Sequence, residues 1–180
     1  MNNNYIGTSM LDEILSRRKE LAIKMLKRQL IVCGIAGIIM TIACITMTSE
    51  IADFFACWIL PAIFAGCYLH NYNYALRTKE RIKNALSLRS DDELEDILQK
   101  SENLNEYAYL SDVCIIDFNL GRATKLSEII TVNKLMQMDV KGKAIMIFRK
   151  AGRSYAIYFK TNQQRAEAIE KINEAISRSI

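Results

Sequence analysis

The chain has 180 residues, of which 51% are hydrophobic and 24% charged, and its net charge is +4 at pH 7. Two long uncharged stretches take up about 40 residues, so the remainder can form only one small soluble domain of roughly 75 residues and connecting helices. A net positive charge can indicate a protein that binds nucleic acid. However, Ser90 to the C-terminus carries thirteen basic against fourteen acidic residues, and the basic excess lies beside the apolar stretches. The charge distribution therefore predicts no nucleic-acid partner.

The first 28 residues are expected to form a basic amphipathic helix. Apolar side chains recur at helical spacing from Met10 to Leu26. The basic residues on the opposite side are Arg17, Arg18, Lys19, Lys24 and Lys27. This pattern is typical of a segment that lies on anionic headgroups, or of an extension of a following membrane helix. A helix that docks onto a partner is the functional alternative.

Two apolar runs follow, Gln29–Ser49 and Phe54–Leu69, and only four residues separate them. A bilayer core of about 30 Å requires ~20 apolar residues in a helix, and the first run meets this need alone. The second run would reach only about 24 Å and must include flanking residues to span. The sequence therefore predicts a two-helix transmembrane hairpin over residues 29–74, with helices at about 29–49 and 52–73.

The charges beside the hairpin predict its orientation. Before Gln29 there are six Lys or Arg against three acids, and from His70 to Arg89 there are five against one. The linker between the two runs carries Glu50 and Asp53 and no basic residue. Because basic residues stay on the cytoplasmic side, we expect a multi-pass protein of the cell (inner or plasma) membrane with both termini cytoplasmic.

Small residues recur along both predicted membrane helices. Such stripes let helix backbones approach closely, because lipid provides no hydrophobic drive for association. An intramolecular hairpin is the simpler interpretation, and homodimerisation is the alternative. The five cysteines are odd in number and show no C-x-x-C pair, so we expect packing residues and neither disulfides nor a metal site. The residues predicted to pack are Cys33, Gly37, Thr41, Cys44, Ala62 and Gly66.

Residues 75–105 are expected to be a helical linker, and residues 106–180 a cytoplasmic domain of strands and one helix. The linker contains an acidic helix start after Ser90, which suits the helix dipole better than a metal site. Thr161 can cap an amphipathic C-terminal helix. The fold class is α+β, with a small antiparallel sheet closed by that helix. Expected strands are 107–110, 113–118, 129–138, 144–150 and 154–160.

Two short motifs in this domain suggest a family. The segment Tyr109–Ile116 reads Tyr-Leu-Ser-Asp-Val-Cys-Ile-Ile, and Lys125–Ile129 reads Lys-Leu-Ser-Glu-Ile. With two later strands and a C-terminal helix, they resemble the bacterial pleckstrin-homology-like (PH-like, GRAM-like) domains, over about residues 106–177. The resemblance implies a domain that binds protein or lipid headgroups and is not catalytic. A full PH-like barrel has seven strands, whereas five are expected here, so the sheet could be incomplete or extended by a partner chain.

No residue set in the sequence spells out a reaction. There is no glycine-rich phosphate loop and no Ser/His/Asp or Cys/His set, and His70, the single histidine, lies at the membrane. We therefore expect no enzyme, no cofactor and no metal, but an interaction module, scaffold or sensor, with membrane lipids and a protein partner or second copy as partners. The alternatives are an immunity protein against a membrane-active peptide or toxin, and a transporter accessory subunit. The residues expected to contact a headgroup or partner are Lys141, Lys143, Arg149, Lys150 and Arg153.

Overall fold

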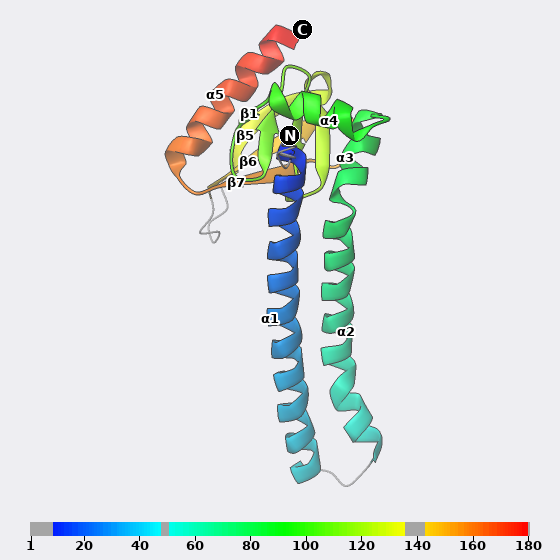
Figure 1. The fold of residues 1–180 in the computed structure, drawn as a ribbon. Coiled ribbons are helices and arrows are strands. Elements are labelled where there is room, and N and C mark those ends of the chain that lie inside the picture. Colours follow the sequence, from blue (N-terminus) through cyan, green and yellow to red (C-terminus); the bar gives the residue numbers. More distant parts are fainter. Residues whose placement is uncertain (1–8, 48–50, 136–142, 180) are drawn as a thin grey trace, which may run out of the picture. The chain divides into compact units, whose positions relative to one another are not determined.

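The computed structural model describes residues 9–47, 51–135 and 143–179, but not the side chains of residues 47–57. The chain divides into two compact units. One is Ser16–Arg77, which is helical, and the other combines Met1–Leu15 with Thr78–Ile180. The second unit is thus discontinuous in the sequence, and it contains residues 78–105, which were expected to form a linker (Figure 1).

The helical unit is built from α1 (Met10–Met47) and α2 (Ile51–Leu76). Ser9 caps the start of α1, because its Oγ accepts the Asp12 N–H at 3.1 Å. Helix α1 then continues without a break through the predicted amphipathic segment and the first apolar run. From Met10 onward the structure therefore has the continuous helical extension, one of the two simple alternatives for the N-terminal segment.

Helices α3 (Thr78–Leu86) and α4 (Asp91–Gln99) begin the second unit. Ser90 caps α4 by accepting the Glu93 N–H at 3.2 Å, and the Glu93 carboxylate accepts the Arg89 N–H at 2.9 Å. Lys79 and Lys83 of α3 each lie 2.7 Å from the Asp91 carboxylate. These two ammonium groups lower the pKa of Asp91 to about 2. The acidic start of α4 is thus a cap and an anchor for α3.

The first sheet is an antiparallel meander in the order β1-β2-β3-β4. In the register, Glu102 lies opposite Leu110, and Ile115 lies between Leu110 and Thr124. Gly121 in the β3–β4 turn has φ of +55°, which favours glycine. The strands are β1 (Glu102–Asn103), β2 (Ala108–Leu110), β3 (Cys114–Asp117) and β4 (Arg122–Lys125), and the 3₁₀ turn Leu126–Glu128 follows.

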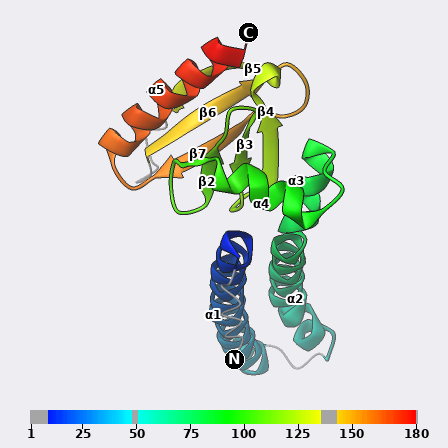
Figure 2. The same cartoon turned by 45° about the horizontal axis from the view of Figure 1, so that its top comes forward.

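The second sheet is also antiparallel, with β6 between β5 and β7. Its strands are β5 (Ile129–Leu135), β6 (Lys143–Arg149) and β7 (Tyr155–Phe159), and α5 (Asn162–Ser179) follows. Figure 2 shows that its strands run in a clearly different direction from those of the first sheet. The described residues thus contain seven strands, two more than the five that the sequence led us to expect. Strand β1 and strand β4 are the two that were missed.

Two hydrophobic clusters cover opposite faces of the first sheet. Ile115 of β3 belongs to the cluster shared with the second sheet and α5, where Ile147 and Ile172 are fully buried. Its neighbours Cys114 and Ile116 belong to the other cluster, which is shared with α3 and α4. This alternation follows from the period of two in a strand. The first sheet is therefore a central layer.

The start of α1 is part of this second cluster. Leu11 is 3% exposed and Ile14 is 6% exposed, and both pack among buried residues of α3, α4 and the first sheet. The Glu95 carboxylate of α4 accepts two backbone N–H groups at the start of α1, from Met10 at 2.9 Å and from Leu11 at 3.0 Å. A carboxylate at a helix N-terminus is favourable because it meets both unpaired N–H groups and the dipole. The first residues of α1, up to Leu15, are therefore part of the core of the β-sheet unit.

Candidate functional site

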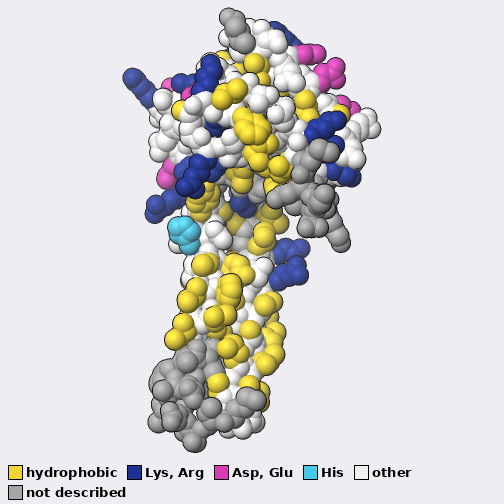
Figure 3. All heavy atoms as spheres, turned by 180° about the vertical axis from the view of Figure 1, so that it is seen from behind, with side chains coloured by type: hydrophobic (Ala, Val, Ile, Leu, Met, Phe, Trp, Pro, Cys, Tyr) yellow, Lys and Arg dark blue, Asp and Glu magenta, His cyan; other side chains and the backbone are white. Residues whose placement is uncertain are grey.

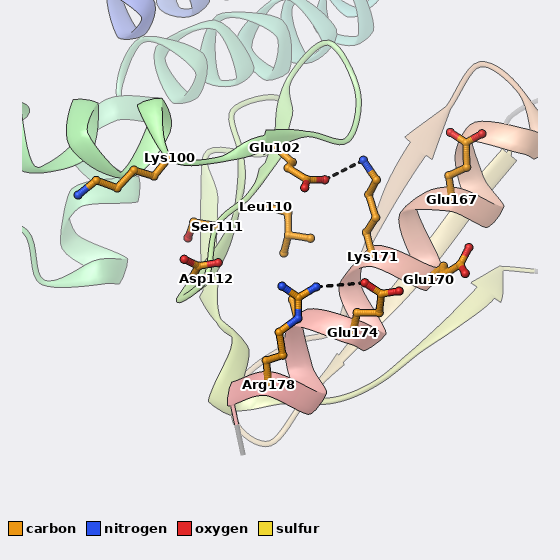
Figure 4. A pocket seen from close by; sticks show the side chains of 11 residues that line it. Lys100, Glu102, Leu110, Ser111, Asp112, Glu167, Glu170, Lys171, Glu174 and Arg178 are labelled. Atoms are coloured by element: carbon orange, nitrogen blue, oxygen red, sulfur yellow. Dashed lines mark hydrogen bonds and ion pairs between the residues drawn. The ribbon is translucent and has the colours of Figure 1, made fainter.

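A polar cleft of about 350 Å³ lies between α5 and the edge of the first sheet. Strand β1 and the end of β2 form one wall, and one face of α5 forms the other (Figure 4). Ala168 and Ile172 of α5 are buried, and their sequence neighbours Glu167 and Lys171, about 100° around the helix, line the cleft. The lining residues are Lys100, Glu102, Leu110, Ser111, Asp112, Glu167, Glu170, Lys171, Glu174, Ala175 and Arg178.

Ion pairs occupy much of this cleft. Lys171 reaches across from α5 to Glu102, with 2.7 Å between Nζ and Oε2, and Arg178 lies 3.1 Å from Glu174 one turn earlier (Figure 4). The hydrogen bond from Lys171 to Glu102 raises the pKa of that lysine. Because both pairs are largely exposed, each contributes little stability and can exchange for a ligand's charges.

The cleft carries an excess of two negative charges, because its lining holds five carboxylates and three basic side chains. Asp112 is held at its edge by the β2–β3 turn. The Ser111 hydroxyl accepts the Cys114 N–H at 3.1 Å and donates to the Cys114 carbonyl at 3.2 Å. The sequence motif Leu-Ser-Asp was noticed, but its role in a turn beside α5 was not. This lining can pair with charged groups, and no histidine or cysteine is among its residues.

A second cleft, of about 290 Å³, follows the outer edge of β7. Five consecutive residues, Ala156–Lys160, line it from end to end. The β1–β2 turn and the β3–β4 turn of the first sheet form the opposite wall. The remaining lining residues are Asn105, Glu106, Tyr107, Asp117, Asn119 and Gln164. The sequence could not indicate this cleft, because its walls belong to strands whose pairing is set by the tertiary fold.

Asn105 connects the two walls of this cleft. Its Oδ1 accepts the N–H groups of Tyr107 at 2.8 Å and Ala108 at 2.7 Å, which shapes the β1–β2 turn. Its Nδ2 donates to the Tyr158 carbonyl of β7 at 2.9 Å. Lys160 at the end of β7 also forms an ion pair with Glu106. One amide side chain therefore shapes a turn of the first sheet and bonds to the edge of the second.

Two substitutions separate these roles of Asn105. Asn105→Asp keeps the acceptor for the two turn N–H groups but puts a carboxylate oxygen in place of the donor to the Tyr158 carbonyl, so we expect the free energy of unfolding to fall by about 1–2 kcal/mol. Asn105→Ala removes all three bonds and should cost about 2–3 kcal/mol. Thermal unfolding of the detergent-solubilised chain, followed by circular dichroism, measures both. Equal losses for the two variants would contradict the assignment of separate roles.

The five basic residues expected to contact a headgroup do not form one patch in the described structure. Lys143 starts β6, whereas Arg149 ends it, so about 20 Å of strand separates them. Arg149 is bound to Glu128 at 2.9 Å, and Lys150 and Arg153 are exposed beside it. Lys141 lies outside the described residues. The structure thus groups three of the five at one end of the β6–β7 hairpin.

Trp58 lies at a close approach of the two helices. A Cβ atom added at Gly37 would lie 2.5 Å from the Trp58 ring, and the Trp58 Nε1 donates to Thr41 Oγ1 at 3.0 Å. Two residues of the predicted small-residue stripe therefore meet an indole. At Gly66 a Cβ atom would meet no other atom within 4 Å, so the structure shows no close approach there. Cys33, the first residue of the stripe, is half-buried, and Ala62 is exposed.

Cys44 was expected to be an unmodified packing residue, but it is disulfide-bonded. Cys33, Cys67 and Cys114 are free. Cys114 is buried in a hydrophobic cluster of the first sheet and packs there, and this burial raises the pKa of its thiol. The prediction that the chain contains no disulfide was therefore wrong at Cys44. Its physical basis, the absence of a C-x-x-C pair, does not exclude pairing between cysteines that are distant in sequence.

Comparisons with known proteins add little. No family model matches the chain, and no curated protein matches it. A weak structural neighbour is the crystal structure of the N-terminally truncated linker-DH/PH domains of p115-RhoGEF, with 14% identity and a TM-score of 0.35. The match covers 86% of this chain and 54% of the other, so the chain spans about half the length of that structure. A likeness this weak carries no argument about function.

Proposed function

We propose that the chain is a membrane protein that holds a PH-like interaction module at the cytoplasmic face. In this proposal α1 and α2 cross the membrane as a hairpin, and both termini are cytoplasmic. The module binds a protein partner and is not catalytic. The observation that carries the proposal is the exposed apolar surface of α1.

One helix among the described residues, Met10–Thr46, is long and apolar enough to cross a membrane. Only 6% of its most apolar stretch of 18 residues is buried. Figure 3 shows hydrophobic side chains along the described parts of α1 and α2. Water-soluble monomers rarely expose contiguous apolar patches of more than a few hundred Å². The exposed residues of α1 include Ile31, Val32, Ile35, Ile38, Ile39, Ile42 and Ile45. A surface of this kind requires a cover, and lipid is the cover that an isolated apolar helix of this length fits.

Helix α2 supports a second crossing. Its 26 residues would extend about 39 Å at 1.5 Å per residue, which exceeds the thickness of a bilayer core. Helix α2 thus includes residues on both sides of the apolar run Phe54–Leu69, which was too short to span a bilayer alone. The disulfide at Cys44, near the end of α1, supports the orientation, because disulfides persist in oxidising compartments outside the cytoplasm.

The strand order supports a PH-like domain. Four antiparallel strands are followed by three, and then by the helix α5, which packs into the core between the sheets. The seven strands among the described residues equal the number in a full PH-like barrel, whereas only five were expected from the sequence. With a complete set of strands, extension of the sheet by a partner is not needed to complete the fold.

The two clefts support binding in place of catalysis. The α5 cleft presents exchangeable ion pairs, and the β7 cleft presents two tyrosines and the edge of a strand. Each suits recognition of another chain more than transfer of a proton. The immunity alternative stays a prediction, because none of the described residues favours it over a scaffold.

Extraction of membranes at alkaline pH tests the proposal. Sodium carbonate releases peripheral proteins and leaves integral proteins in the pellet, so the full chain is expected in the pellet. Release of most of the chain into the supernatant would contradict the membrane hairpin. Hydrolysis of a phosphoester or peptide by the purified full chain would contradict the non-catalytic part of the proposal.

A further inference from the structure

We infer that the outer edge of β7 is a docking site for an extended segment of a partner protein, which adds to the second sheet as a fourth strand. This inference deepens the proposed interaction module and rests on it. The occupant is a single strand with apolar residues at alternate positions. The site is the β7 cleft, which the sequence did not indicate.

The first step is the direction of the backbone groups of β7. In an antiparallel pair, residues alternate between those whose N–H and C=O both point to the neighbouring strand and those whose groups both point away. The Tyr158 carbonyl accepts a bond from Asn105, across the cleft, and therefore points away from β6. Tyr158 lies opposite Ala144, and Ala156 lies opposite Met146. Since Ala156 is two residues from Tyr158, its N–H and C=O also point away from β6.

The second step is that most backbone groups along this edge have no partner. Strand β7 is at the end of its sheet, with β6 as its neighbour. Among the described residues, the outward N–H groups of Ala156 and Tyr158 donate no hydrogen bond, and the Ala156 carbonyl accepts none. Tyr158 is 48% exposed and Ala156 is half-exposed. These three unpaired backbone groups can pair with an added strand, while the fourth outward group, the Tyr158 carbonyl, already accepts from Asn105.

The third step is the shape of the cleft, which decides between occupants. It runs along the whole of Ala156–Lys160 and is closed on its far side by the turns that contain Asn105 and Asn119. A second copy pairing through its own β7 would bring a whole sheet and its facing turns against that wall. A volume of about 290 Å³ instead admits a few residues of one extended segment. The cleft therefore favours a single strand over a second copy.

The fourth step is the chemistry of the lining. The Lys160 ammonium and the Glu106 carboxylate neutralise each other, and Asp117 is buried. Tyr107 and Tyr158 provide aromatic surface with polar ends. An apolar side chain that faces this surface buries the rings of the two tyrosines, whereas a charged one would first have to displace the existing ion pair between Lys160 and Glu106. Alternate apolar residues are therefore expected in the partner segment.

The test uses the full chain in detergent and a phage-displayed library of random dodecapeptides as the probe. The most enriched peptide is synthesised, and its affinity is measured by fluorescence anisotropy. Ala156→Pro removes one outward N–H and is compatible with an edge strand, so it should weaken binding at least tenfold. Ala156→Val changes the same side chain but keeps the N–H, and should leave the affinity within about twofold. Circular dichroism confirms that both variants fold.

A second measurement does not depend on a variant. Hydrogen exchange followed by mass spectrometry should show slower exchange in residues 155–159 when the peptide is bound. A selection that enriches no peptide, equal binding to the wild type and Ala156→Pro, or unchanged exchange in β7 would each overturn the inference. If binding survives Ala156→Pro but is lost in Glu170→Lys of the α5 cleft, the inference fails while the proposed interaction module stands. The carbonate extraction tests the proposed membrane hairpin separately from this docking site.

Discussion

Replacing Leu11 by alanine should lower the free energy of unfolding of the β-sheet unit by about 2–5 kcal/mol, the usual cost of removing a buried leucine side chain. Leu11 is 3% exposed among residues of α3, α4 and the first sheet, although it lies near the start of the chain. The measurement is urea or thermal unfolding of the detergent-solubilised full chain, followed by near-ultraviolet circular dichroism of the tyrosines.

The matched control for Leu11 is Ser16→Ala. Ser16 is on the same helix but exposed, so its substitution should change stability by no more than about 0.5 kcal/mol. Helix propensity would change little in either variant, which leaves burial as the difference between them. Equal stability of the Leu11→Ala variant and the wild type would show that the start of α1 is not part of the core.

The double substitution of Ile38 and Ile42 by arginine should abolish stable insertion into the membrane. Each arginine near the centre of a membrane helix costs about 2.5–3.5 kcal/mol on insertion scales. In an aqueous environment the same change at an exposed isoleucine would cost almost nothing. The carbonate-resistant fraction of the full chain measures the effect, and we expect it to fall from most of the protein to a small minority.

Val113 provides the control for these arginines. It is 58% exposed in the β-sheet unit, close to the exposure of Ile38, which is 56%. Val113→Arg should therefore leave the carbonate-resistant fraction unchanged, because in the proposed arrangement this position faces water. If the double variant stayed in the membrane pellet as fully as the wild type, residues 38 and 42 would not face lipid.

The two long helices could be predicted because each apolar run is continuous and needs no partner to be recognised. The burial of Leu11 in the core of the β-sheet unit could not be predicted. Its spacing with Ile14 indicates only an apolar helix face, which lipid or protein can cover equally well. In the structure this helix face is covered by protein at the start of α1, where the Glu95 carboxylate, 84 residues away from Leu11, accepts the Leu11 N–H. A single sequence carries no indication of such a distant pair.

The strands were predicted where apolar residues alternate or run together, as in β3, β6 and β7. Strand β1 was missed because Glu102 and Asn103 are both exposed and polar, so no periodicity exists in two residues. Strand β4 was missed because Arg122–Lys125 begins and ends with a basic residue. Both strands exist because β2 and β3 provide hydrogen-bonding edges beside them, which is a property of the sheet and not of the local sequence.

The candidate site was the least predictable part. Basic residues attract attention as contacts for phosphate, yet β6 separates Lys143 from Arg149 along its length. The two clefts instead depend on polar residues such as Asn105 and on backbone groups of β7, whose direction is set by strand pairing. Neither has a composition that distinguishes it from an ordinary turn or strand. Their positions became evident only in three dimensions.

The central claim, a membrane hairpin with the β-sheet unit in the cytoplasm, is tested most directly by cysteine accessibility in whole cells. Single cysteines are introduced at Ser16, Ser49 and Ser101 in a variant that lacks the native cysteines, and an impermeant thiol reagent is applied. The eleven basic residues on the two flanks predict labelling at Ser49 and none at Ser16 or Ser101 until the cells are opened. Labelling of intact cells at Ser16 or Ser101, with none at Ser49, would contradict the claim and place the β-sheet unit on the opposite side of the membrane.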